Sequence, residues 1–229
     1  MSLAKRLLSV QPAGGGGGGG PAEVTYQGAA TSGVNAITYT FTSQAIGAAS
    51  SDRIVVVGLI SRAAGTSLAS GTVTIDGVSA PVQTQAVNTI SNSSYAGLFS
   101  LAVPTGTTAT VEATLNVGCV RAAIGVWTIT GASLATAADF DSASNASNST
   151  TSNVSVLAGG SMIGVTYSGG DSPFWTVLAQ NYAFEPQPGK GGITSGASAD
   201  FASASTPTVT CSYIGNSSPV GVFAAWDPA

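Results

Sequence analysis

Short runs of alternating apolar and polar residues recur along most of the chain. In the run 36–42, Ile37, Tyr39 and Phe41 alternate with threonines, which is the period-two pattern of a strand with one buried face. The run 53–61 is apolar between its ends and is typical of a central strand covered on both faces. Turn signals separate such runs at intervals of about eight to twelve residues, the spacing of a sandwich or barrel. We therefore predict an all-β protein built as a β-sandwich.

The clearest turn is formed by Asp76 and Gly77, which stand between two β-like runs. Both residues tolerate a positive φ, so they favour a hairpin. After residue 22 no segment has the sustained period of about 3.6 residues and the caps of a helix. Two polar stretches interrupt the strand pattern. We expect 139–153 to be a surface loop or the connection between two sub-sheets, and 185–198 to be a second irregular loop.

The second half of the chain resembles the first. The run 109–127 is similar to 207–223, and 54–58 is similar to 162–165. Two explanations stay open: a duplicated set of strands that forms the two sheets of one sandwich, or a composition rich in Gly, Val and Thr. Glycine inside such strands indicates a bulge or a close approach of two backbones. We expect the tryptophans at positions 127 and 226 to be matching core residues.

Residues 1–22 form an arm ahead of the sandwich body, 23–229. The apolar residues of 1–11 have the spacing of one side of a short helix, which needs a partner surface to be stable in water. The seven consecutive glycines 14–20 are a flexible tether, with a root-mean-square span on the order of 15 Å. The arm is either a dispensable tail or a docking peptide. In the second case the docking residues are Leu3, Lys5, Arg6, Leu7, Leu8 and Val10.

The composition argues against most enzyme classes. The chain has 229 residues, a net charge of −4, 7% charged residues and no histidine, so it lacks the commonest general base and metal ligand. Its six Lys and Arg residues do not cluster on any expected face, and we expect no binding to nucleic acid. No apolar run reaches the roughly 18 residues of a membrane span. The arm has no continuous apolar stretch and no cleavage site, so we expect no export signal.

No motif points to a catalytic, cofactor or metal site. Asp139 and Asp141 are close in sequence, but the positions after them do not complete a Ca²⁺-binding loop. The ten acidic residues show no spacing that favours a catalytic pair. We therefore expect a protein that is not an enzyme and uses no cofactor. Cys119 and Cys211 both lie in strand-like runs, and without an export signal two buried free thiols are favoured over a disulfide.

Aromatic residues gather in the second half, at Phe174, Trp175, Tyr182 and Phe184. An exposed platform made by the first three would stack on the sugar rings of a glycan. Alternating aromatic residues of strands are more often part of the core. Both roles stay open at this point.

Four stretches carry a resemblance to a known group of proteins. They are 51–58 (SDRIVVVG), 73–78 (VTIDGV), 103–111 (VPTGTTATV) and 124–131 (IGVWTITG). Together they resemble small proteins of tailed bacteriophages and prophages, which are virion components with β-sandwich or jelly-roll bodies. The resemblance covers residues 36–229, is strongest over 51–131, and carries no catalytic residue.

The resemblance implies a jelly-roll-like sandwich on the particle surface, as a head decoration, head spike, fibre-base protein or tail appendage. The expected function is that of a non-enzymatic virion structural protein, bound to other virion proteins through its arm. Low charge and high apolar content favour a homo-oligomer. The alternative is a receptor-recognition module that binds host-surface glycan through Phe174, Trp175 and Tyr182. Head or tail location, oligomer number and host are left open.

Overall fold

The computed structural model of the chain describes residues 20–65, 67–90, 93–144, 148–186, 191–215 and 219–229. Within these residues it contains sixteen β-strands and no helix, which confirms the all-β prediction. The strands form an eight-stranded, a five-stranded and a three-stranded sheet.

The first half of the chain supplies β1 (Glu23–Ser32), β2 (Ala36–Ala45), β3 (Ile54–Ala63), β4 (Gly71–Ile75), β5 (Val78–Ala80), β6 (Val82–Asn88), β7 (Ser94–Ala102) and β8 (Thr108–Thr130). These strands form one sheet folded into two layers, because the 23-residue strand β8 runs through both. In the first layer the beginning of β8 lies between β2 and β4, with β5 beyond β4. In the second layer the rest of β8 lies between β1 and β3, with β7 and β6 beyond β3. The first two strands thus lie beside the last one, which is the winding of a jelly-roll sandwich.

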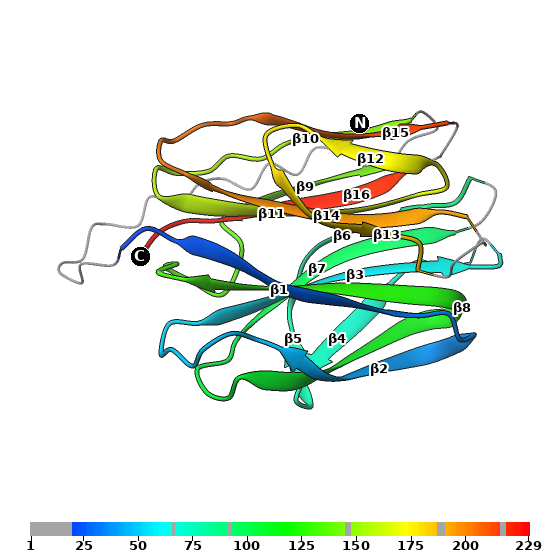
Figure 1. Cartoon of the computed structure of the whole chain (residues 1–229), viewed down its shortest axis with the longest axis horizontal. Coiled ribbons are helices and arrows are strands. Elements are labelled where there is room, and N and C mark those ends of the chain that lie inside the picture. Colours follow the sequence, from blue (N-terminus) through cyan, green and yellow to red (C-terminus); the bar gives the residue numbers. More distant parts are fainter. Residues whose placement is uncertain (1–19, 66, 91–92, 145–147, 187–190, 216–218) are drawn as a thin grey trace.

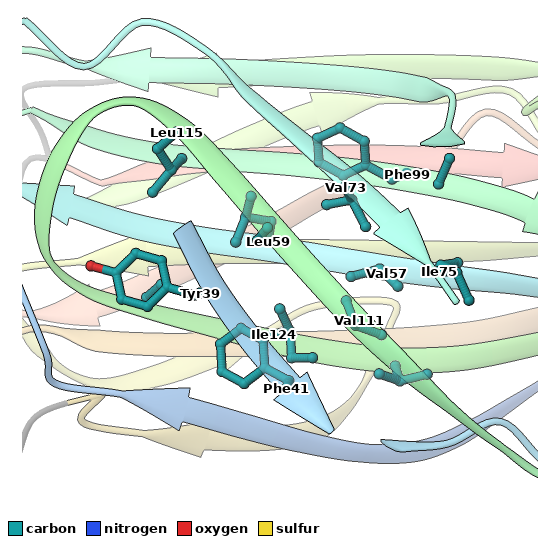
Figure 2. Close-up of a cluster of buried hydrophobic side chains, with 14 of the residues drawn as sticks. Tyr39, Phe41, Val57, Leu59, Val73, Ile75, Phe99, Val111, Leu115 and Ile124 are labelled. Carbon is teal, nitrogen blue, oxygen red and sulfur yellow. The ribbon is translucent and has the colours of Figure 1, made fainter. Parts of the chain in front are cut away.

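The core of this first sandwich comes from alternate residues of both layers. Figure 2 shows Tyr39 and Phe41 of β2 in one cluster with Leu59 of β3 and Phe99 of β7. Removal of these side chains from water is the main force that holds the two layers together. Ile37, expected on the buried face with Tyr39 and Phe41, is exposed, because the register of β2 shifts between positions 36 and 38.

The second half supplies β9 (Asp139–Ser144), β10 (Ser149–Asn153), β11 (Gly160–Ser168), β12 (Asp171–Trp175), β13 (Ala179–Phe184), β14 (Ile193–Phe201), β15 (Thr208–Ile214) and β16 (Val220–Trp226). The layer β13-β14-β11-β16-β9 has the strand order of β6-β7-β3-β8-β1, and the layer β12-β15-β10 has that of β4-β8-β2. The two halves therefore share one topology. Each half builds a sandwich of its own, so of the two explanations left open for the internal similarity, the one in which the halves form the two sheets of one sandwich does not describe this structure.

The two sandwiches stack face to face, so the molecule has four layers (Figure 1). One buried cluster fills each sandwich, and a third lies between the β3 layer and the β11 layer. We call this third region the seam. Trp127 of β8 and Trp226 of β16 are both fully buried there, as expected for core residues.

Glycines let the two sandwiches approach closely at the seam. A Cβ atom added at Gly58 would lie 2.5 Å from Cγ1 of Val165. One added at Gly125 would lie 2.5 Å from Cε1 of Tyr182. Glycine inside a strand was expected to mark either a bulge or a close approach. At these two positions it allows the close approach.

The polar stretch 139–153 contains β9 and β10, so the expectation of a surface loop there is wrong. Thr150 and Ser152 of β10 are buried where β10 pairs with β15. The inward residues of β10 are thus hydroxyl residues. A strand pattern is recognised in a sequence when its inward residues are apolar, so this strand was missed. The stretch 185–198 is irregular only in part, because β14 begins at Ile193.

The two cysteines lie in different cores. Cys119 belongs to the cluster inside the first sandwich and Cys211 to the cluster inside the second. Both are free and buried, which confirms the favoured interpretation. Because the seam separates the two clusters, a disulfide between them is geometrically excluded.

Candidate functional surfaces

The arm joins the body at one end of the seam. The backbone N–H of Ala22 donates to the carbonyl of Gly159 at 2.6 Å, and Oγ of Ser161 donates to the carbonyl of Ala22 at 2.7 Å. Ala22 is fully buried in the seam, whereas Gly20 is exposed. The last residues before β1 are therefore fixed to the body. The predicted docking residues lie outside the described residues: Leu3, Lys5, Arg6, Leu7, Leu8 and Val10.

The C-terminus lies at this same end (Figure 1). The N–H of Ala229 donates to the carbonyl of Gly131 at 2.8 Å. Two exposed leucines, Leu134 and Leu157, are close by. The N–H of the residue before Leu134 donates to the backbone carbonyl of Asp227, and the N–H of Leu157 donates to the side-chain Oδ1 of Asp227.

The three aromatic residues considered for sugar stacking do not share a surface. Phe174 of β12 is 68% exposed, whereas Trp175 and Tyr182 are only 7% and 8% exposed. Trp175 packs on Phe223 inside the second sandwich and donates from Nε1 to Oγ of Ser195 at 2.8 Å. Tyr182 packs in the seam. Only Phe174 is therefore open to a ligand.

Phe174 belongs to the outer face of the sheet β10-β15-β12. Its cross-strand partner is Ser212, and Ile214, which is 69% exposed, follows two positions along on the same face of β15. Hydroxyl groups continue this face, where Oγ1 of Thr151 lies 3.2 Å from Oγ1 of Thr210. We call this surface the outer β12 face.

Backbone strain occurs within β12 and just after it. Ser172 has a φ of 50° and Val177 a φ of 73°. Val177 is the central residue of a γ-turn, in which the N–H of Leu178 donates to the carbonyl of Thr176 at 2.8 Å. A positive φ is rare for a β-branched residue, and strain of this kind concentrates at functional sites.

Most acidic side chains bind backbone N–H groups. The pairs are Asp52 with Gly131, Asp76 with Thr110, Asp139 with Ser155, Asp141 with Asn153, Asp200 with Val24 and Asp227 with Leu157. The hydroxyl of Ser50 and the N–H of Gly131 hold the pKa of Asp52 below its ordinary value. Within the described residues no three Cys, Asp or Glu side chains form a group that could hold a metal ion. These carboxylates fix strand ends and loops in place.

Two arginines meet at the end of the seam opposite the arm. Arg62 of β3 and Arg121 of β8 are cross-strand partners. Arg121 is 3% exposed, and its Nη1 donates to the carbonyl of Gly191 at 2.6 Å. The expectation that the basic residues do not cluster is wrong for this pair. The register that joins them lies between strands far apart in sequence, so no local pattern could have indicated it.

No protein-family model, curated protein or solved structure matches the chain. The described residues include no helix that is long and apolar enough to cross a membrane. Function is therefore inferred from the residues of this chain alone.

Proposed function

We propose that the protein is a non-enzymatic structural component of a bacteriophage particle, attached to other virion proteins through its N-terminal arm. The root of the arm carries the proposal. Ala22 is buried in the seam and hydrogen-bonded to the strand β11 and the residue before it. Both sandwiches contribute residues to the seam. A force applied to the arm is therefore transmitted to both of them. Jelly rolls are common building units of viral capsids.

The chemistry of the body supports a role without catalysis. The chain has no histidine. Burial raises the pKa of both cysteine thiols, so neither is a ready nucleophile. Six carboxylates bind backbone N–H groups. These groups stabilise the fold and are not directed at a common point.

Resistance to proteolysis also fits the surface of a particle. Trypsin cleaves after Lys and Arg, and the body contains only four such residues, Arg53, Arg62, Arg121 and Lys190. Arg53 and Arg121 are buried. A protease of this specificity therefore meets few accessible bonds in the folded body.

Deletion of residues 1–19 tests the role of the arm. The cut stops before Ala22, because removal of this buried residue would damage the body as well. We expect the 20–229 chain to keep the thermal unfolding curve of the full chain and to be absent from purified particles. A full-length chain with Leu7→Asp and Leu8→Asp keeps the tether and should also be absent. Normal incorporation of the 20–229 chain would contradict the proposal.

The outer β12 face favours a second candidate, binding of a host-surface glycan. Phe174 presents an exposed aromatic ring beside a row of hydroxyl groups, and aromatic rings of this kind stack on apolar sugar faces. Residues with a strained backbone lie within β12, at Ser172, and just after it, at Val177. A receptor-binding protein is also a virion protein, so the two functions are compatible.

Phe174→Ala is the variant that tests glycan binding. It removes an exposed ring and should abolish saturable binding to a host polysaccharide while the melting temperature stays unchanged. Phe140→Ala is the matched control, because Phe140 is also exposed but lies on β9 in another sheet. A flat response of the full chain across a panel of host glycans would exclude this second function.

A further inference from the structure

We infer that residues 3–10 of the arm dock on the body of their own chain, at the surface where the arm joins it. The inference concerns the chain outside a particle, so it does not rest on the proposed function. We call this place the root surface. It has an apolar part, formed by Pro21, Leu134, Leu157 and Pro228, and an acidic part, formed by Glu23, Asp52, Asp200 and Asp227.

The apolar part leaves large side chains in water. Leu134 is 66% exposed and Leu157 is 54% exposed. Pro21 and Pro228 lie beside them, since a Cβ atom added at Gly159 would be 3.4 Å from the Cβ of the first and 3.7 Å from that of the second. Apolar side chains that are grouped in this way gain free energy when a partner covers them.

The acidic part surrounds these residues. The backbone hydrogen bonds already described place Asp52, Asp200 and Asp227 at this end of the body, and Glu23 is the first residue of β1. Asp227 joins the two parts, because it accepts one backbone N–H from the segment of each exposed leucine. The root surface therefore combines apolar side chains with negative charge.

The three arginines of the described residues bind other groups. Arg53 is buried and donates to backbone carbonyls. Arg62 and Arg121 are cross-strand partners at the opposite end of the seam. A peptide that carries basic and apolar side chains together is thus complementary to the root surface in both charge and hydrophobicity.

Residues 3–10 have this composition. They comprise two basic and four apolar residues, Lys5 and Arg6 with Leu3, Leu7, Leu8 and Val10. The spacing of the apolar residues predicts one side of a helix that is too short to be stable alone in water. The peptide therefore needs a partner surface, and the root surface supplies one.

The length of chain outside the described residues favours the arm of the same chain as this partner. The glycines 14–20 lead directly to Pro21, and a glycine run of this length spans on the order of 15 Å. A short linker of this kind holds a peptide at a local concentration on the order of millimolar. A weak contact is then mostly formed within one chain, whereas a second copy has to compete with it.

Docking covers the apolar side chains of the arm and of the root surface at the same time. Local contacts of this strength open well before global unfolding, so the arm adds little to the melting temperature of the body. A virion protein that takes up the arm has to compete with the root surface for it.

Limited digestion of the full chain with trypsin tests the inference. Trypsin cleaves the arm after Lys5 and Arg6, and mass spectrometry follows the loss of these residues over time. The reference is a synthetic peptide of residues 1–13. We expect cleavage of the full chain to be about fivefold slower than cleavage of the peptide, since partial burial of one leucine side chain stabilises a contact by about that factor.

The double variant Leu134→Asp and Leu157→Asp should restore the rate of the free peptide, because it places further negative charge where the arm has to bury leucines. Val34→Asp is the matched control. Val34 is 65% exposed and lies in the turn after β1, at the end of that strand remote from the arm. This variant should keep the slow rate. Thermal unfolding of each variant shows that its fold is intact.

Dilution of the protein separates the two sources of the arm. Protection by the same chain does not depend on protein concentration, and added salt should reduce it, since opposite charges contribute to the contact. Three results would overturn the inference: cleavage of the full chain at the rate of the peptide, equal protection in the double variant and in Val34→Asp, or loss of protection on dilution. The last result would assign the root surface to the arm of a second copy.

Discussion

Arg53 is a buried cation whose charge is balanced by carbonyl dipoles. Its side chain donates five hydrogen bonds, with lengths from 2.6 to 3.0 Å, to backbone carbonyls of the β2–β3 and β7–β8 connections. The acceptors are the carbonyls of Gly47, Ala48, Val103, Thr105 and Gly106. Nη1 has two N–H groups and faces three of these carbonyls, those of Gly47, Ala48 and Gly106, so one N–H is shared between two acceptors. The fixed plane of the guanidinium lets its donors reach both connections at once.

Arg53→Lys should therefore be strongly destabilising although it keeps the charge. An ammonium group cannot reach both connections, and several buried carbonyls would be left without donors. We expect the free energy of unfolding to fall by about 3–5 kcal/mol, the range for disrupting a buried charged network. Urea denaturation measures the change. Arg62→Lys, at a partly exposed position, is the control and should cost less than about 1 kcal/mol. Similar losses in the two variants would contradict this role of Arg53.

The buried thiols should be inert in the native protein. Burial raises the pKa of Cys211 from its ordinary value of 9.0 to about 11, and it raises that of Cys119 as well. At pH 8 a thiol reagent should label neither cysteine in the folded chain and both in denaturant. Fast labelling of the native chain at either position would show that the core opens there.

The same pKa shift predicts a dependence of stability on alkaline pH. The folded protein holds the Cys211 proton more tightly than the unfolded chain does. Its contribution to stability is therefore fully present below pH 9 and is lost as the pH rises through about 11. Denaturation curves between pH 8 and pH 11 should show a smaller decline for Cys211→Ala than for the full chain. Parallel curves would count against a raised pKa.

At the scale of strands, the sequence indicated those elements whose inward residues are apolar. The run 36–42 and the run 53–61 correspond to β2 and β3 because their periodicity reflects burial directly. β10 was not recognised, since its inward residues are Thr150 and Ser152. The pairing of Arg62 with Arg121 depends on the register of β3 with β8. Register between distant strands is a tertiary property, so no local pattern contains it.

Glycines of the seam allow a test of packing at the same scale. Gly125→Ala places a methyl group 2.5 Å from a ring carbon of Tyr182, and overpacking of this kind costs about 1–3 kcal/mol. Gly118→Ala lies in the same strand, where the nearest atom outside the adjacent residues is Oδ1 of Asn35 at 3.5 Å. We expect a clear loss of stability in urea for the first variant and little change for the second. Equal effects would mean that glycine is not required for close approach at the seam.

At the scale of the whole molecule, two sandwiches of one topology share a buried interface. Trp127 from the first sandwich and Trp226 from the second lie in the same cluster. Separation of the sandwiches would expose this apolar surface to water. Neither half can therefore open without a cost to the other.

We accordingly expect one cooperative unfolding transition for the full chain. Tryptophan fluorescence reports the seam and the second sandwich, and far-ultraviolet circular dichroism reports all the strands. The two denaturation curves should coincide, which is the test for two-state behaviour. Two separated transitions would show that the sandwiches are independent domains.

The proposed role as a particle component depends on the arm and the body together. A body fixed at the seam to the root of a tethered peptide is suited to attachment at a surface. Jelly-roll topology agrees with this role, since jelly rolls are common building units of viral capsids.

Peptide mass spectrometry of purified particles, with heads and tails separated, tests the central claim most directly. We predict stoichiometric recovery of body peptides in one of the two fractions. Recovery with heads would identify a decoration or head-spike protein, and recovery at low copy with tails would favour receptor binding by the outer β12 face. Absence from both fractions would contradict the virion role.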